Sequence, residues 1–233
     1  MLRLERAAAA LEVVLCSGFP TQIVVIAILS IVGLKPTLAA GEWSPRFVFA
    51  LTLLDTLLLV GLVLFFIRSH GESARDLLFG SRPPGREALV GLLVIPASFA
   101  IVILVLMLVQ FVAPSLRNVP HNPLQDLLKS PLDAVIFGFV VMIAGGVREE
   151  VQRGFILRRF EQYLGGGAAG LVIFSAVFSL GHLEQGRDVA LATGVLGFYW
   201  GALYLRRRSI LAPMIGHAGF DLSQVLKFVI LKG

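Results

Sequence analysis

Long runs of apolar residues, separated by short polar segments, make up most of the chain. Residues 13–34 and 88–114 carry no charged side chain, and residues 47–67 carry only Asp55. Each run exceeds the roughly 18 consecutive apolar residues that mark a membrane-spanning helix. The pattern therefore predicts an all-α fold, a polytopic transmembrane helical bundle.

The same pattern predicts about seven spans, within a range of about six to eight. They are expected over residues 11–34, 46–68, 87–113, 132–158, 167–184, 188–205 and 209–230. We expect an uncleaved, partly amphipathic lead-in before the first span, and a short interfacial helix over residues 124–129. With no internal repeat in the chain, one integrated membrane domain is predicted. Residues 1–130 supply three spans and residues 131–233 supply four.

The composition agrees with a membrane protein and limits the partners. Hydrophobic residues make up 57% and charged residues 15% of the chain, and the mean hydropathy is +0.86. Soluble domains carry about 25% charged residues. The net charge of +5 arises from basic residues between the spans, so we expect a lipid bilayer as partner and no nucleic acid. Cys16 is the single cysteine, which excludes an intrachain disulfide.

The basic residues are divided unevenly between the two sides of the predicted membrane. With the N-terminus inside, the inner segments hold more of them than the outer segments. The inner residues are Arg3, Arg6, Arg68, Arg75, Arg82, Arg86, Arg158, Arg159, Arg206, Arg207 and Arg208, and the outer ones are Lys35, Arg46, Arg117, Lys129, Arg187, Lys227 and Lys232. The positive-inside rule therefore favours a cytoplasmic N-terminus. The expected location is the cytoplasmic membrane of a bacterial or archaeal cell.

A cluster of charges interrupts the fourth predicted span. Glu149, Glu150 and Arg153 follow an apolar stretch directly, although a charge at the bilayer centre costs at least about 2.5–3.5 kcal/mol. These side chains must face a protein interior, a wet cavity or an interface. Arg153 is four residues from Glu149 and three from Glu150, so it can pair with either. A purely structural ion-pair cluster is one explanation.

Two further polar sites lie on separate apolar segments. On the fifth predicted span, His182 lies one helical turn after Phe178, and His217 and Asp221 lie one helical turn apart on the seventh. Each polar group needs compensation in an apolar setting, so we expect the three sites to converge on one buried site. A carboxylate beside an imidazole can activate water. Alternatively, His182, His217 and a carboxylate can hold a divalent metal such as zinc. Both arrangements favour hydrolysis of an acyl bond.

These motifs resemble those of the CAAX protease and bacteriocin-processing (CPBP, or Abi) family of intramembrane proteases, which includes the type II CAAX prenyl endopeptidases. That family carries Glu-Glu-x-x-x-Arg, Phe-x-x-x-His and His-x-x-x-Asn/Asp motifs. Phe178 and His182 match the second motif, and His217 and Asp221 match the third. The resemblance covers about residues 130–225 and implies an intramembrane endopeptidase. Its substrate would be a membrane-associated protein or peptide.

The first motif is one residue shorter than the family pattern. Aligned on the glutamate pair, Glu149 is the first glutamate of the motif. Aligned on Arg153, Glu149 is the second and Arg148 takes the place of the first. The resemblance implies that the first glutamate is the catalytic base. We predict Glu149 as the base and Glu150 as the partner of Arg153, with the exchanged roles as the alternative.

The remaining predicted roles follow from the same resemblance. His182 would help Glu149 to activate water, and His217 and Asp221 would stabilise the oxyanion or help to bind a metal. For Glu149 and His182 to meet, we expect a long, tilted or broken fourth helix. Two other functions stay open. One is a non-catalytic membrane immunity or scaffold protein. The other is a small proton-coupled transporter that relays protons through Asp55, Glu149 and His182.

Overall fold

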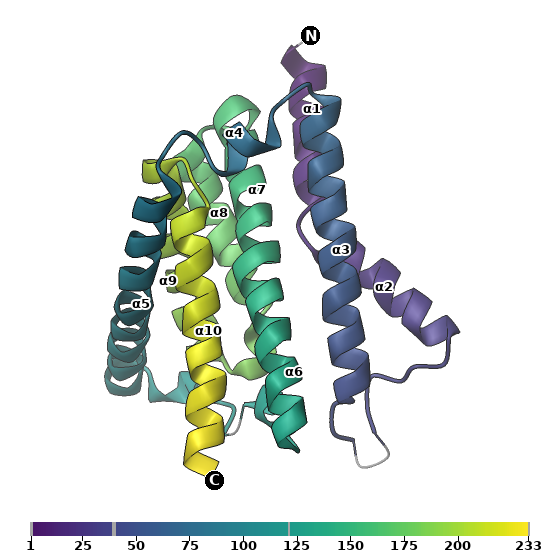
Figure 1. Cartoon of the computed structure of the whole chain (residues 1–233), viewed down its shortest axis with the longest axis vertical. Helices are drawn as coiled ribbons and strands as arrows, with labels where there is room; N and C mark the ends of the chain where they lie inside the picture. Colours follow the sequence, from purple (N-terminus) through teal and green to yellow (C-terminus); the bar gives the residue numbers. More distant parts are fainter. Residues whose placement is uncertain (1, 39–40, 121, 233) are drawn as a thin grey trace.

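Helices form the whole framework of the protein (Figure 1). The computed structural model describes residues 2–38, 41–120 and 122–232, without the side chains of residues 2, 228, 231 and 232. The α-helices are α1 (Leu2–Leu15), α2 (Phe19–Ile31), α3 (Pro45–Ser69), α4 (Ala74–Leu78), α5 (Pro84–Val112), α6 (Pro131–Val141), α7 (Glu150–Tyr163), α8 (Gly167–Leu180), α9 (Arg187–Arg207) and α10 (Leu211–Lys232). The described residues contain no β-strand, which confirms the all-α prediction.

Short helices of other types connect these elements. A π-helix, η3 (Met142–Glu149), joins α6 to α7. Among the described residues, the 3-10 helices are η1 (Pro114–Leu116), η2 (Pro123–Leu127) and η4 (Leu183–Gln185). Helix η2 corresponds to the short helix expected over residues 124–129.

Fewer helices are long and apolar enough to cross a membrane than the sequence pattern predicts. Among the described residues there are 4, or up to 5 if the bent pair of α1 and α2 counts as one span. The first predicted span is bent by 44° at Gly18, whose φ of 93° lies in the left-handed region. Helix α8 has only 14 residues. Helix α10 carries His217 and Asp221 among its apolar residues and is also not among the candidates.

The fourth predicted span is the longest helical rod in the protein. It continues from Pro131 to Tyr163 over 33 residues, which is about 50 Å at 1.5 Å per residue. The hydrocarbon core of a bilayer is about 30 Å thick, so this rod must tilt or project beyond it. Of the long, tilted or broken helix expected here, the structure has a long one, and its length brings Glu149 to the depth of His182. Glu149 lies about 21 Å from the Tyr163 end, and α8 spans a similar length before His182.

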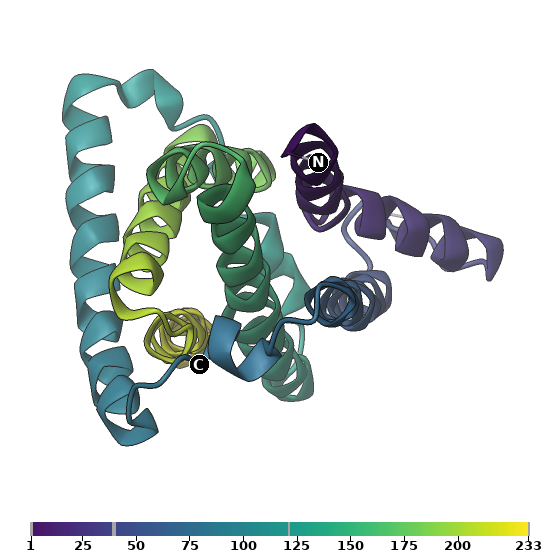
Figure 2. The ribbon, with the colours of Figure 1, turned by 90° about the horizontal axis from the view of Figure 1, so that it is seen from above.

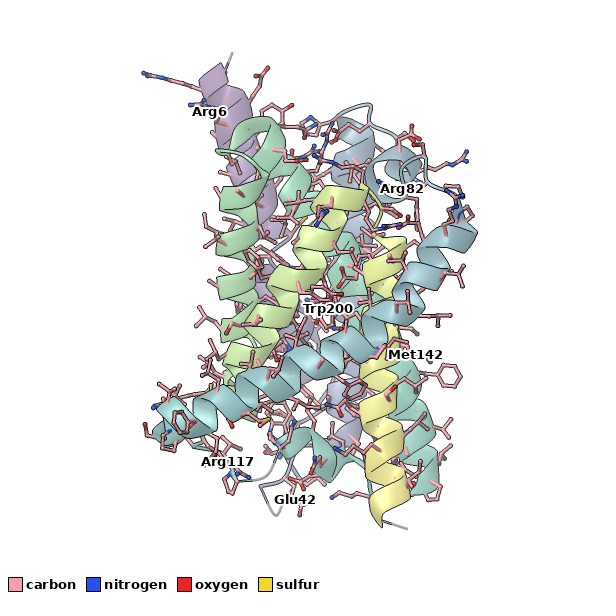
Figure 3. All side chains as sticks on the ribbon, turned by 90° about the vertical axis from the view of Figure 1, so that its left-hand side faces the viewer. Arg6, Glu42, Arg82, Arg117, Met142 and Trp200 are labelled. Carbon is pink, nitrogen blue, oxygen red and sulfur yellow. The ribbon has the colours of Figure 1, made fainter. Side chains whose placement is uncertain are left out.

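The helices form a bundle with two flanks. Helices α1–α3 lie on one side, α5 lies on the other, and α6–α10 occupy the space between them (Figures 1 and 2). Arg6 and Arg82 lie at one end of the bundle, whereas Glu42 and Arg117 lie at the other (Figure 3). Apolar side chains cover much of the outer surface of α2, α3 and α5, as expected for helices that face lipid.

Glycines bring α10 into close contact with α5. A Cβ atom on Gly216 would lie 2.2 Å from Cγ1 of Val94, and one on Gly91 would lie 2.6 Å from Cβ of Ile215. Small residues at such crossings allow two backbones to approach closely, which is the usual basis of helix association in membranes. The α5–α10 crossing therefore depends on residues without side chains.

A buried guanidinium joins α1 to α7 at the end of the bundle that carries Arg6. Nε of Arg159 bonds to Glu12 at 2.7 Å, and its Nη1 bonds to Glu72 at 2.6 Å. Burial raises the pKa of the Glu72 carboxyl, but hydrogen bonds from Gln162 and Arg159 outweigh it and hold that pKa below its usual value. The N-terminal helix is therefore attached to α7, the helix that carries Glu150.

We expect Gly216→Leu to destabilise the protein, because the new side chain would overlap Val94 at the crossing. Overpacking of this kind costs about 1–3 kcal/mol. Gly61→Leu is the matched control, since nothing lies within 4 Å of a Cβ atom at Gly61. Thermal unfolding in detergent, followed by tryptophan fluorescence, measures both variants. Equal melting temperatures would show that the crossing is not closely packed.

Candidate functional site

A fully buried ion pair lies at the centre of the site. The guanidinium of Arg153 bonds through Nη1 to Oε1 of Glu150, three residues earlier on α7. Three aromatic rings surround this guanidinium: Phe178 at 5.1 Å, Phe174 at 5.5 Å and Trp200 at 5.6 Å from its carbon to the ring centroids. Such rings attract a cation, so the pair is held without contact with lipid. Of the two predicted partners, Arg153 is paired with Glu150.

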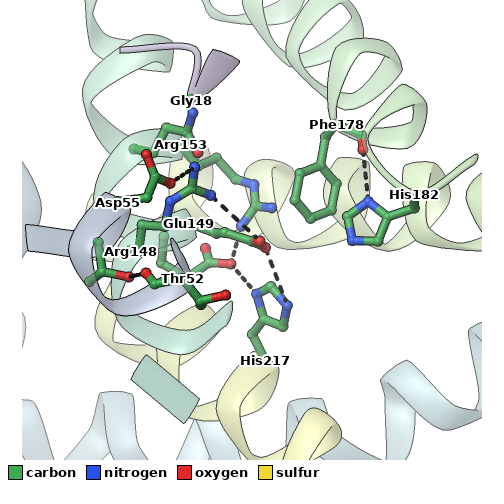
Figure 4. Close-up of polar contacts among 12 residues, drawn as sticks. Gly18, Thr52, Asp55, Arg148, Glu149, Arg153, Phe178, His182 and His217 are labelled. Atoms are coloured by element: carbon green, nitrogen blue, oxygen red, sulfur yellow. Dashed lines mark hydrogen bonds and ion pairs between the residues drawn. The ribbon is translucent and has the colours of Figure 1, made fainter. Parts of the chain in front are cut away.

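His217 connects the two glutamates to α10. Its Nδ1 lies 2.9 Å from Oε1 of Glu150, and its ring stacks on Trp200 with centroids 3.7 Å apart. Its Nε2 lies 3.7 Å from Oε2 of Glu149 and 3.5 Å from Oδ2 of Asp221 (Figure 4). Because a carboxylate only accepts, Nδ1 of His217 donates to Glu150. The other ring nitrogen therefore faces Glu149 and Asp221.

Gly145 makes room for this arrangement on the π-helix. A Cβ atom there would lie 2.3 Å from Oδ2 of Asp221 and 3.1 Å from Nε2 of His217. At the adjacent Gly146, a Cβ atom would lie 2.6 Å from Cβ of Ala218. The glycine pair thus allows α10 to approach η3 closely enough for His217 to reach the glutamates. π-Helical turns are rare in proteins, and those that do occur are often found at functional sites.

His182 is held by the turn that precedes it. Its Nδ1 lies 2.9 Å from the carbonyl oxygen of Phe178, and the two rings are 4.8 Å apart at their centroids (Figure 4). A carbonyl only accepts, so Nδ1 carries the proton and Nε2 of the neutral ring is a free acceptor. The four-residue spacing of Phe178 and His182 thus fixes both the tautomer and the orientation of the ring.

One cavity of about 690 Å³ lies between α5, α6, η3, α9 and α10. Four of the predicted site residues line it: Glu149, His182, His217 and Asp221. Apolar side chains such as Val102, Leu196 and Phe220 form much of its wall, and Asn122, Gln125, Gln185, Gln224 and Lys227 add polar groups. The other two predicted residues, Glu150 and Arg153, do not line the cavity. They are fully buried behind it.

Sequence reasoning did not identify one further contact of Glu149. Nη2 of Arg148 lies 2.6 Å from Oδ2 of Asp55 on α3, and Nη1 lies 3.8 Å from Oε1 of Glu149 (Figure 4). Arg148 and Asp55 are both buried. Asp55 was visible as an isolated charge in an apolar segment and Arg148 as the residue that precedes the glutamate pair, and their opposite signs were the available signal. Because the two residues are far apart along the chain, the sequence did not show that they pair.

The fit of a metal ion can be judged from the candidate ligands. Within the described part of the chain, no three His, Cys, Asp or Glu side chains form a group suited to hold one. Nδ1 of both histidines is engaged, by Glu150 at His217 and by the Phe178 carbonyl at His182, so Nε2 of each ring is the nitrogen that a metal could reach. The described residues therefore show no preformed three-ligand group. The metal role of His182 and His217 stays a prediction, and we assign no step to a metal.

Comparison with known proteins identifies the segment that carries this site. Residues 131–223 match a family model described as type II CAAX prenyl endopeptidase Rce1-like. The chain carries an Rce1-like domain. This match confirms the family resemblance predicted from the motifs, and the Rce1-like domain includes every predicted site residue. With the apolar helices, the match indicates an integral membrane protein, and the family that the model describes is one of proteases. No curated protein and no solved structure matched the chain.

We expect Arg153→Met to destabilise the Rce1-like domain strongly, because it leaves the buried Glu150 carboxylate without its partner. Loss of one member of a buried pair costs about 3–5 kcal/mol. The double variant Glu150→Gln with Arg153→Met should recover part of this loss, since neither charge remains. Lys129→Met is the control, because it removes an exposed ion pair with Glu42 and should change stability little. Additive effects in the double variant would contradict a direct pairing.

Proposed function

We propose that this protein is an intramembrane endopeptidase that hydrolyses a peptide bond of a membrane-associated protein or peptide. The observation that carries the proposal is the single cavity lined by Glu149, His182, His217 and Asp221. All four residues belong to the Rce1-like domain. A cavity that combines apolar walls with a few convergent polar groups is the usual form of a substrate site.

Glu149 and His182 act together on the attacking water. The carboxylate of Glu149 and the ring of His182 are turned toward each other from the two sides of the cavity (Figure 4). Water has two O–H bonds, and the site offers two acceptors: the Glu149 carboxylate and Nε2 of His182. When both accept from one water, a lone pair of its oxygen remains free to attack the carbonyl carbon. Glu149 takes the proton as the new C–O bond forms.

His217 stabilises the negative charge that develops on the carbonyl oxygen. In its protonated form, His217 donates from Nδ1 to Glu150 and from Nε2 to the oxyanion. Glu150 and the stacked ring of Trp200 hold the imidazole in place. Asp221, 3.5 Å from Nε2, orients that nitrogen before the substrate arrives. Collapse of the tetrahedral intermediate breaks the C–N bond, and Glu149 returns its proton to the leaving amine.

The two glutamates have different surroundings, which supports Glu149 as the base. Glu149 lines the cavity, whereas Glu150 is fully buried and its Oε1 is engaged by both Arg153 and His217. A base must reach the water that it deprotonates. Glu150 therefore acts through His217, as a positioning residue. The short motif is accommodated because Arg153 pairs with the glutamate three residues away.

The proton-transporter alternative has less support from the same contacts. A relay through Asp55, Glu149 and His182 needs three groups that can exchange protons in sequence. Asp55 is buried against Arg148 and is not part of the cavity wall. Its carboxylate is bonded to Arg148 instead of facing the cavity that Glu149 and His182 share. The scaffold alternative differs from the protease in one measurable respect, which is turnover.

We expect Glu149→Gln to abolish cleavage and to leave folding intact, because the amide keeps the shape but cannot accept the proton. A general base contributes about 10²–10⁴-fold to rate. Terminal proteomics of membranes from cells that produce the wild type or the variant measures the peptide termini that the enzyme creates. Glu184→Gln, at an exposed position outside the cavity, is the control and should retain activity. Cleavage by Glu149→Gln together with its loss in Glu150→Gln would exchange the roles of the two glutamates.

The two histidines should respond differently to removal. His182→Ala should lose cleavage about as completely as Glu149→Gln but keep its melting temperature, since the ring is only half-buried and bonds to its own turn. His217→Ala should lose cleavage and also about 1–3 kcal/mol of stability, because Glu150 loses a buried hydrogen bond. Activity and thermal unfolding are measured on the same preparations. Unfolding of His182→Ala would instead favour a scaffold role for that ring.

A further inference from the structure

The two ends of the bundle differ in their basic residues. Arg6 and Arg82 mark one end (Figure 3). Contacts join the connecting segments there: Nε of Arg82 donates to the carbonyl of Arg207, and Arg207 pairs with Glu87 at 2.6 Å. Arg208 pairs with Glu161 at the end of α7. We call this the arginine-rich end, and its residues are Arg3, Arg6, Arg68, Arg75, Arg82, Arg86, Arg158, Arg159, Arg206, Arg207 and Arg208.

The opposite end carries fewer basic residues and a network of amide side chains. The amide of Asn122 donates to Oε1 of Gln185 at 3.3 Å, and the side chain of Asn118 accepts from the backbone nitrogen of Arg187 at 2.8 Å. These contacts connect the α5–α6 segment to the start of α9. Arg117 and Glu42 mark this end (Figure 3). We call it the amide end.

The cavity is continuous with the amide end. Its wall includes Asn122, Gln125, Gln185, Gln224 and Lys227, and two of these, Gln224 and Lys227, are exposed. His217 lies ten residues before Lys227 on α10, so the site is about 15 Å deeper than this rim. The arginine-rich end contributes none of the described wall residues. The chemistry is therefore reached from the amide end.

The arginine-rich end and the position of the cavity together indicate from which side of the membrane the cavity is reached. Short connections rich in arginine remain on the cytoplasmic side of a membrane, and the arginine-rich end consists of such connections. We propose that the cavity opens to the non-cytoplasmic side, and that the substrate is a membrane-anchored peptide whose scissile bond lies in the non-cytoplasmic half of the bilayer. That the occupant of the cavity is a substrate rests on the proposed function, whereas the side of the membrane to which the cavity opens does not depend on it.

The wall of the cavity also suits a peptide that enters from this side. Val102, Leu106 and Phe220 offer apolar surface to the part of the chain that leaves the lipid. The amides of Asn122, Gln125 and Gln185 lie where an unwound backbone would need hydrogen-bond partners. Unpaired backbone groups are costly in a dry site, so amide side chains at the rim lower the cost of exposing the peptide bond.

Cysteine labelling tests the side of access directly. Cys16 is the single cysteine and is buried, so Cys16→Ala provides a background without thiols. Three single-cysteine variants are made in it. Glu184→Cys marks the amide end, Gln224→Cys marks the exposed cavity wall, and Asp76→Cys marks the arginine-rich end. Spheroplasts are treated with a sulfonated maleimide that does not cross membranes, before and after permeabilisation.

We expect Glu184→Cys and Gln224→Cys to react in intact spheroplasts, and Asp76→Cys to react only after permeabilisation. The reverse pattern would overturn the proposal. Labelling of Glu184→Cys without Gln224→Cys would also overturn it, because the cavity would then be closed to that side. Labelling requires no turnover, so this result is independent of the Glu149→Gln experiment.

Discussion

The rest of the site depends on one buried carboxylate, that of Glu150. It is fully buried, and one of its oxygens meets both the guanidinium of Arg153 and the imidazole of His217. An unpaired charge in this position would be too costly to keep. α7, α10 and the aromatic rings of α8 and α9 must therefore pack in the one arrangement that compensates it. That arrangement also directs Nε2 of His217 into the cavity, so folding and site geometry have the same cause.

Much of the architecture could be predicted from the sequence because its signals are local. Continuous apolar runs predict helices, and isolated charges in them predict a shared polar site, which is where Glu149, His182, His217 and Asp221 lie. The number of spans was less predictable. The bend at Gly18 and the short α8 depend on backbone conformation and packing, which periodicity does not report. α10 fills a place in the bundle although its polar residues lower its hydropathy.

The pairing of charges was the least predictable feature, because it depends on three-dimensional proximity. Spacing allowed Arg153 to pair with Glu149 or Glu150, and only the surroundings distinguish them. The hydrogen bonds of the π-helix span five residues instead of the four of an α-helix, and periodicity arguments assume α-helical geometry throughout. The short first motif gave an ambiguous alignment because one residue is missing between the glutamate pair and Arg153, whereas the contacts of Arg153 and His217 are specific.

The contact between Arg148 and Asp55 limits how far the Rce1-like domain can be separated from the N-terminal helices. Asp55 belongs to α3, outside residues 131–223, yet its partner Arg148 lies beside Glu149. A chimaera that joins the Rce1-like domain to other helices would leave the Arg148 guanidinium without its counter-ion in an apolar setting. That loss is worth several kcal/mol. The N-terminal helices and the domain are therefore expected to be inherited together, with a carboxylate retained on α3 wherever an arginine precedes the glutamate pair.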